Sequence, residues 1–165
     1  IDKIGRDTIR LYKNNRIGTV IKHIPGHGLS RKDTHFNLPY ISNSLNYLEK
    51  HDFSIFKNKK SMFAMTAHIV FKALDKNDCV THSKKSISYI RNKIGFKNLI
   101  ISDDISMKAL KYEFSENVRR AFAAGCNLVL HCSGNMKEMN SLAKISPKLD
   151  QFIIKKTSEF YKLLS

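Results

Sequence analysis

The sequence predicts an α/β fold in which short parallel strands alternate with helices. Four short apolar runs recur along the chain, segments with helical spacing of apolar residues lie between them, and each run ends near a polar, reactive residue. Neither a Gly-x-Gly-x-x-Gly nor a Gly-x-x-x-x-Gly-Lys-Ser/Thr motif is present, which argues against the nucleotide-binding versions of this fold class.

The apolar runs predict four strands. They lie at residues 18–22, 61–66, 98–102 and 126–131. The run at 61–66 is continuously apolar, which is typical of a parallel strand buried on both faces. Because helices separate these strands, the strands are expected to pair in parallel, either in a closed (β/α)8 barrel or in an open sheet.

Helices are expected where apolar residues recur every three or four positions. These segments are 2–14, 42–51, 83–93, 115–124, 136–143 and 149–163. Ser83 has a side chain preferred at a helix N-cap, and Gly95 and Gly125 stand where helices favour a left-handed C-terminal residue.

Composition indicates one globular domain over residues 1–165, with 42% hydrophobic and 26% charged residues. The net charge is +15, but the lysines are scattered, so nucleic acid is not an expected partner. No apolar run approaches the ~18 residues that span a bilayer, and no signal-peptide pattern opens the chain. Three cysteines without Cys-x-x-Cys spacing favour a reducing compartment, so we expect a cytoplasmic protein without a membrane partner.

The polar segment at residues 22–35 has the densest group of reactive side chains. Asp33 lies two residues before His35, so its carboxylate could orient the imidazole for proton transfer near neutral pH. Asp103, at a predicted strand end, could serve as a nucleophile or a general base. Each pattern also has an ordinary interpretation: a local hydrogen bond for Asp33, and the start of the next helix for Asp103-Asp104.

Considered together, these segments resemble bacterial β-N-acetylglucosaminidases of glycoside hydrolase family 3 (the NagZ type). The resemblance rests on Lys-His-Ile-Pro-Gly-His-Gly at 22–28, Asp-Thr-His at 33–35 and Ile-Ser-Asp-Asp-Ile-Ser-Met at 101–107. The stretches at 65–70 and 121–130 match the family in the same order. This resemblance implies a TIM-like (β/α)8 barrel, of which the chain would hold about four C-terminal βα units.

The resemblance also implies a mechanism. Asp103 would attack the sugar to form a covalent glycosyl-enzyme, His35 would act first as acid and then as base, and Asp33 would orient His35. The expected reaction is hydrolysis of terminal β-linked GlcNAc, from muropeptides of peptidoglycan turnover, with no cofactor and no metal.

Further residues are assigned to the sugar by the same resemblance. Lys22 and His23 match family positions that contact the substrate, and His68 is a further candidate for the sugar pocket. The two glycines Gly26 and Gly28 would give the loop freedom to move over the substrate.

Two other hypotheses stay open at this point. The first is a metal-dependent hydrolase whose ligands are His23, His27, Asp33 and His35. The second is an inactive or split fragment that acts as a basic binding module. A half-barrel leaves sheet edges and an apolar face uncovered, so the chain alone is expected to be poorly stable or self-associating, nearly inactive, and in need of an N-terminal half-barrel.

Overall fold

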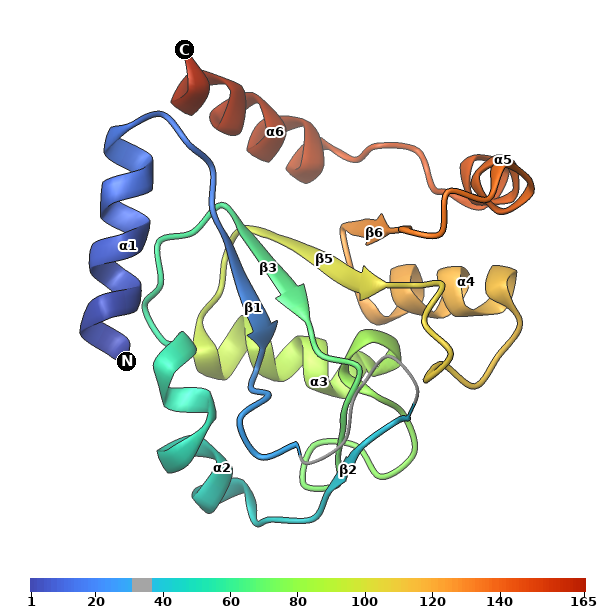
Figure 1. The fold of residues 1–165 in the computed structure, drawn as a ribbon, viewed down its shortest axis with the longest axis horizontal. Helices are drawn as coiled ribbons and strands as arrows, with labels where there is room; N and C mark the ends of the chain where they lie inside the picture. The colour runs from blue at the N-terminus through green and yellow to red at the C-terminus, as the bar shows by residue number, and fades with distance from the viewer. Residues whose placement is uncertain (31–36) are drawn as a thin grey trace.

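A four-stranded parallel sheet forms the centre of the molecule. The structure is a computed structural model and describes residues 1–30 and 37–165. The strands pair in the order β1-β3-β5-β6, and every pair is parallel, as the sequence predicts (Figure 1). Their bounds are β1 Val20–Ile24, β3 Phe63–Thr66, β5 Leu99–Asp104 and β6 Leu128–Leu130. The parallel order fits part of a (β/α)8 barrel.

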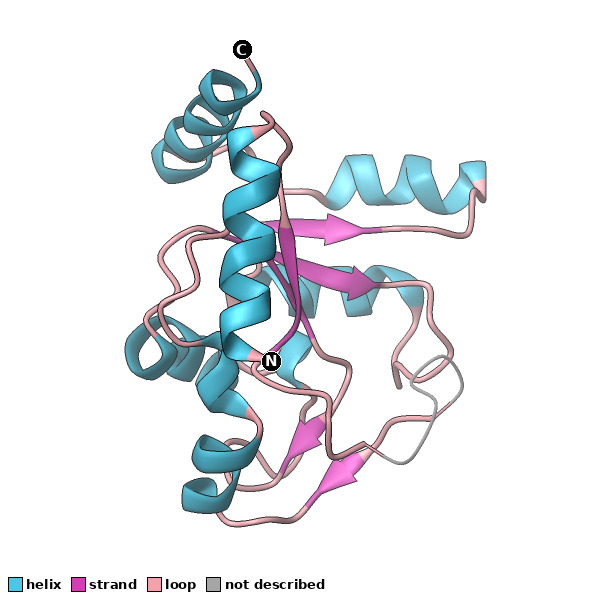
Figure 2. Cartoon of the chain, turned by 60° about the vertical axis from the view of Figure 1, so that its left-hand side comes forward, coloured by secondary structure: helices cyan, strands magenta, loops and turns pink. Residues whose placement is uncertain are grey.

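One helix, α1 Asp2–Asn14, precedes the first strand, and the other helices follow strands along the chain. These are α2 Leu45–His51, α3 Lys84–Tyr89, α4 Phe114–Ala124, α5 Met136–Ile145 and α6 Gln151–Leu164. In Figure 1, α1 runs beside β1, α3 lies behind the sheet, and α6 lies near the ends where the strands begin. Figure 2 shows α1 in front of the edge of the sheet. Among the described residues, no helix has the length and apolar character needed to cross a membrane.

The predicted helix ends are confirmed by their geometry. The Ser83 hydroxyl accepts a hydrogen bond from the Ser86 amide at 3.1 Å, which makes it the N-cap of α3. Gly95 and Gly125 have φ of +81° and +112°, the left-handed region that favours glycine. The predicted helix at 83–93 is divided, because α3 continues as a π-helix, η3, over Ile90–Ile94.

Very short elements were not predicted. Strands β2 Tyr40–Ile41 and β4 Val70–Phe71 form a separate parallel pair, and the 3-10 helices η1 Phe53–Phe56 and η2 Val80–His82 join longer elements. Two to four residues are too few to show a hydrophobic period. β1 also lies two residues further along the chain than expected, and β5 extends to Asp104.

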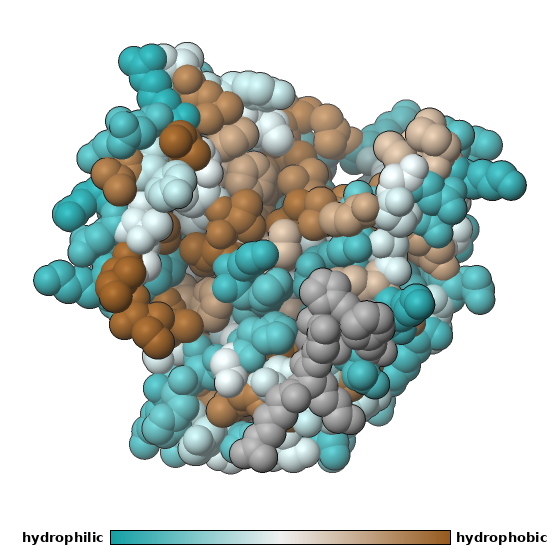
Figure 3. Space-filling model, in the orientation of Figure 1, coloured by the Kyte–Doolittle hydropathy of each residue, from teal (hydrophilic) through white to brown (hydrophobic). Residues whose placement is uncertain are grey.

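One face of the sheet is packed against α3 and α4, whereas the other has a helix contact only at the start of β3 among the described residues, where Phe63 meets Phe160 of α6. Ala64 and Ile100 are fully buried on the face toward α3 and α4, in one cluster with Ile87 of α3 and Val118 of α4. On the other face, Phe63, Met65 and Ile101 are only partly buried, so the prediction that strand 61–66 is buried on both faces is wrong. Figure 3 shows hydrophobic side chains gathered over the strands on this open side. A barrel would enclose this face, whereas four strands leave it uncovered.

A buried histidine makes the fold sensitive to acid. His82 in η2 packs against α4, and burial, together with the nearby His68 and Arg120, lowers its pKa to about 4. Its protonation therefore favours the unfolded chain, so the stability that it contributes is complete above pH 6.5 and is lost as the pH falls toward 4. From pH 7 to pH 5 the free energy of unfolding should drop by about 2 kcal/mol through this residue.

Urea denaturation at pH 7 and pH 5 measures this effect. His82→Gln should reduce the difference between the two pH values, whereas His51→Gln, a change at an exposed position of α2, should leave it unchanged. An unchanged pH dependence in His82→Gln would contradict the assignment.

Candidate active site

The reactive side chains predicted from the sequence meet at the carboxyl ends of the parallel strands. His23 lies on β1, Thr66 ends β3, His68 follows it, and Asp103 lies near the end of β5. This is the edge at which parallel α/β proteins hold their catalytic groups. The other two predicted catalytic residues, Asp33 and His35, lie outside the described residues, so their assignment stays a prediction.

Asp103 presents a carboxylate that is partly open to solvent. One oxygen, Oδ1, accepts a hydrogen bond from the Asp104 amide at 2.9 Å. The other, Oδ2, lies 3.5 Å from Nε2 of His23, and the two side chains are 13% and 25% exposed. The carboxylate is therefore held in one orientation and still accessible, as a nucleophile must be.

The neighbouring Asp104 has a different role. Its carboxylate accepts hydrogen bonds from the amides of Ser106 and Cys132, at 3.0 and 3.1 Å, and from the Ser106 hydroxyl at 2.7 Å. These bonds join the turn after β5 to the segment after β6. The next helix begins only at Phe114, so the interpretation that the Asp pair starts a helix is wrong.

His23 approaches Asp103 as a neutral imidazole. Burial lowers the pKa of His23, and His27 and Lys22 act in the same direction, while the Asp103 carboxylate opposes them. Between Ile21 and Ile24 the pairing of β1 with β3 shifts register, and the Lys22–His23 and Ile24–Pro25 peptide bonds are cis. Lys22 is exposed beside this irregular segment.

A residue that sequence reasoning missed supports the loop after β1. Asp52 is almost completely buried at the end of α2, and its Oδ1 accepts a hydrogen bond from the Gly28 amide at 3.2 Å. Burial raises the pKa of this carboxyl, against the lowering effect of hydrogen bonds from the loop backbone. A Cβ at Gly26 would collide with the Asp52 carboxylate, so Gly26 serves close packing at least as much as the loop freedom expected from the sequence. A single Asp after a helix carries no sequence signal for this contact.

His68 does not face the open site. Its side chain is fully buried, Nδ1 lies 2.8 Å from the Thr81 hydroxyl, and Nε2 lies 3.0 Å from the Asp104 carbonyl oxygen. Both ring nitrogens are therefore occupied at a buried position behind Asp103, which does not favour the expected contact between His68 and the sugar; that contact stays a prediction. His131, at the end of β6, is paired with Glu138 at 2.7 Å.

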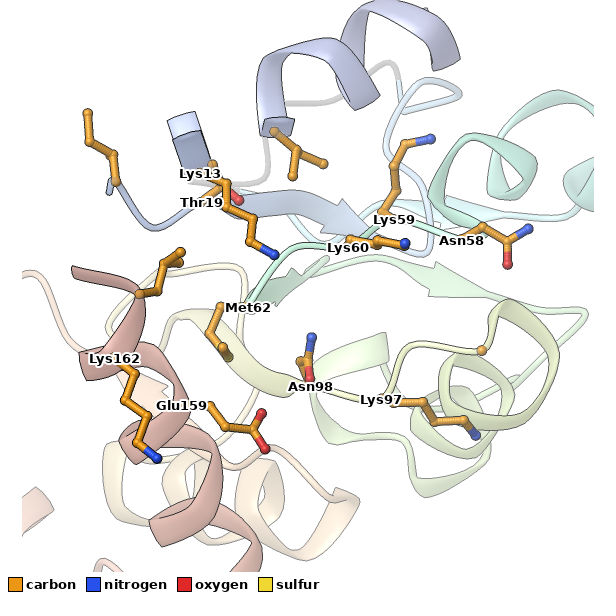
Figure 4. A pocket seen from close by; sticks show the side chains of 14 residues that line it. Lys13, Thr19, Asn58, Lys59, Lys60, Met62, Lys97, Asn98, Glu159 and Lys162 are labelled. Carbon is orange, nitrogen blue, oxygen red and sulfur yellow. The ribbon is translucent and has the colours of Figure 1, made fainter. Parts of the chain in front are cut away.

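A cavity of about 660 Å³ lies at the other end of the sheet, between α1, α6 and the starts of the strands (Figure 4). Lys13, Lys60, Lys97 and Lys162 are among the residues that line it. Lys22, His23, His68 and Asp103, the predicted site residues that the structure describes, do not line this cavity.

Comparison with known proteins shows to which family the chain belongs. Residues 1–157 match the Glycosyl hydrolase family 3 N terminal domain. The chain belongs to glycoside hydrolase family 3. A beta-hexosaminidase of Photobacterium profundum is 30% identical over 99% of this chain, and one of Nitrosomonas eutropha is 34% identical over 68% of it.

Solved structures of this family have the same fold. The β-N-acetylglucosaminidase of Thermotoga maritima is 26% identical, with a TM-score of 0.76 over 99% of this chain and 38% of its own. Zinc-bound CbsA of Thermotoga neapolitana is 30% identical, with a TM-score of 0.82 over 98% of this chain and 40% of its own. The chain spans only 52% and 34% of the two curated relatives named above.

Proposed function

We propose that this family 3 chain carries the nucleophile half of a retaining exo-β-N-acetylglucosaminidase. The observation that carries the proposal is the partly exposed Asp103 carboxylate at the end of β5, 3.5 Å from His23. The names of the relatives, beta-hexosaminidase and β-N-acetylglucosaminidase, support GlcNAc as the sugar. The proposed substrate is terminal β-linked GlcNAc on cytoplasmic muropeptides from peptidoglycan turnover.

The proposed reaction has two displacements at the anomeric carbon. Asp103 attacks this carbon while His35 gives a proton to the leaving oxygen, which leaves a glycosyl ester on Asp103. In the second step His35 takes a proton from water, the water oxygen attacks the same carbon, and the Asp103 carboxylate is released. Asp33 holds the imidazole of His35 in the tautomer that this exchange needs.

The residues of β1 fit the recognition of sugar hydroxyls. A neutral His23 can donate from one ring nitrogen and accept at the other, which suits a hydroxyl group. Lys22 is a cationic donor on the same strand end. We assign both to the substrate, whereas the ring nitrogens of His68 are occupied inside the protein, which does not favour a sugar contact there.

The open face of the sheet supports a further part of this proposal. Met65 and Ile101 are only partly buried there. The beta-hexosaminidase of Photobacterium profundum matches 99% of this chain, but this chain spans only 52% of that protein. We propose that an N-terminal half-barrel, in the same polypeptide or in another, covers this face and completes the sugar site. The 165 residues alone should then self-associate in size-exclusion chromatography and show little turnover.

The test is hydrolysis of a chromogenic β-GlcNAc by the longest polypeptide in which this chain is encoded, with the corresponding β-glucoside as control. Release from β-GlcNAc, with NMR showing the β-anomer as the first product, is the expected result. Release of the α-anomer, or equal hydrolysis of the β-glucoside, would overturn the proposal. Activity that survives a chelator would also exclude the metal-dependent alternative based on His23, His27, Asp33 and His35.

A further inference from the structure

The end of β5 that carries Asp103 is held by side chains as well as by backbone pairing. The regular pairing of β5 with β3 reaches Met65 and Ile101. The pairing with β6 shifts register after Ile101 and resumes at Asp104, opposite Leu130. Beyond Ile101, the Asp103 amide donates to the Thr66 hydroxyl at 3.4 Å, and the Asp104 carbonyl lies 3.0 Å from a ring nitrogen of His68. Asp103 therefore lies in the irregular part of the ladder, between the pairs that Ile101 and Asp104 make with β6.

The contact of the Asp103 amide with Thr66 and the contact of the Asp104 carbonyl with His68 are the two ends of one continuous set of hydrogen bonds. The Thr66 and Thr81 hydroxyls lie 2.8 Å apart, and the Thr81 hydroxyl lies 2.8 Å from Nδ1 of His68. The side chains of Thr66, Thr81 and His68 are all fully buried. Since a buried polar group without a partner is costly, each proton in this set is expected to have an acceptor.

The direction of each hydrogen bond follows from the one between His68 and the Asp104 carbonyl oxygen. A carbonyl oxygen can only accept, so Nε2 of His68 must carry the proton that it shares with Asp104. Burial lowers the pKa of His68, which keeps the ring neutral and leaves Nδ1 as an acceptor for the Thr81 hydroxyl. Thr81 then has no second proton, so Thr66 must donate to Thr81, and the free lone pair of Thr66 accepts the Asp103 amide.

The Thr81 hydroxyl has one other possible acceptor, the Ala67 carbonyl oxygen, but this hydrogen bond would be weaker. The Thr81 hydroxyl is also 3.5 Å from the Ala67 carbonyl oxygen, much longer than its 2.8 Å contact with His68. If Thr81 donated to Ala67, Nδ1 of His68 would need the proton, and Nε2 would then oppose the Asp104 carbonyl without one.

We propose that Thr66, Thr81 and His68 are positioning residues, which fix the backbone on both sides of the Asp103 carboxylate by one directed set of hydrogen bonds. This inference rests on the proposed role of Asp103 as nucleophile. It gives His68 a function without sugar contact: the imidazole restrains the Asp104 carbonyl, while Thr66 restrains the Asp103 amide. A displaced nucleophile reacts more slowly even when substrate binds normally.

Comparing Thr81→Val with Thr81→Ser separates the effect of the Thr81 hydroxyl on activity from the effect of its side-chain shape. Thr81→Val keeps the branched side chain and removes the hydroxyl, so Nδ1 of His68 loses its donor and Thr66 loses its acceptor. Thr81→Ser keeps the hydroxyl. In the β-GlcNAc assay we expect Thr81→Val to lower kcat about 10- to 100-fold with little change in KM, and Thr81→Ser to stay near the wild type. Equal kcat values for the two variants, or a loss confined to KM, would overturn the positioning role.

Two NMR measurements on the longest polypeptide in which this chain is encoded test the network without activity. The ¹⁵N shifts of His68 at neutral pH should show the tautomer protonated at Nε2, and amide exchange at Asp103 should be about tenfold faster in Thr81→Val than in Thr81→Ser. A tautomer protonated at Nδ1, or equal exchange in both variants, would overturn the proposed network. If the network is found but the wild-type enzyme does not hydrolyse β-GlcNAc, the proposed function fails and the hydrogen-bond assignment stands.

Discussion

Asp103→Asn is expected to reduce the hydrolysis of β-GlcNAc by about 10³-fold or more, because an amide is too weak a nucleophile to form the glycosyl-enzyme. Asparagine has nearly the same shape, and its carbonyl oxygen can still accept the Asp104 amide, which is 2.9 Å from Oδ1 in the present chain. The backbone at the end of β5 should therefore be preserved. The loss would report on chemistry at this one side chain.

Asp104→Asn is the matched control, since it makes the same chemical change one residue away. Asp104 Oδ1 accepts the amides of Ser106 and Cys132, and an asparagine oxygen can accept both. The Ser106 hydroxyl can also donate to that oxygen. We expect this variant to keep its activity within about tenfold of the wild type, because exposed or partly exposed substitutions that retain their hydrogen bonds have small effects.

A fluorinated GlcNAc that reacts quickly and is released slowly should reveal the intermediate. Intact mass spectrometry should show one sugar on the wild type and on Asp104→Asn, and none on Asp103→Asn. Peptide mapping should place the sugar on Asp103. A sugar on Asp104, or normal turnover by Asp103→Asn, would show that the nucleophile has been assigned to the wrong residue.

The sequence was sufficient for the order of elements because apolar periodicity is local. The strand that ends near Asp103 and the helix stop at Gly125 both depend on residues close together in the chain, and both were predicted correctly. The strand after residue 60 was predicted as fully buried because its apolar composition says nothing about which elements cover each face. Burial of Met65 depends on chain elements that a local pattern does not contain.

The candidate site was predictable only in part, for the same reason. Family resemblance pointed to Asp103 and His23, and the structure brings them within 3.5 Å of each other. The resemblance also offered His68 as a candidate for the sugar pocket, whereas the hydroxyl of Thr81, 13 residues away, lies 2.8 Å from one nitrogen of its ring. Asp52 was missed because its contact with Gly28 spans 24 residues and has no motif.

Arg91→Ala is expected to cause the largest loss of stability, because Arg91 connects the start of β5 to two other segments. Its Nη1 donates to the carbonyl oxygens of Phe96 and Asn98, at 3.1 and 2.5 Å, and its Nη2 donates to Oδ1 of Asn127 at 2.7 Å. That same Asn127 oxygen accepts the Ile100 amide at 2.9 Å. Removing the guanidinium leaves partly buried carbonyl groups unpaired, which should lower the free energy of unfolding by about 2–4 kcal/mol.

Two variants separate the effect of the Arg91 hydrogen bonds on stability from the effect of its positive charge. Lys93→Ala removes a positive charge from an exposed position of the same π-helix and should change stability by less than about 0.5 kcal/mol. Arg91→Lys keeps the charge but replaces a planar group with several fixed donors by a single ammonium, so it should restore only part of the loss. Urea denaturation at constant pH measures all three. If Arg91→Ala were no less stable than Lys93→Ala, the hydrogen bonds of Arg91 would not hold the start of β5 in place.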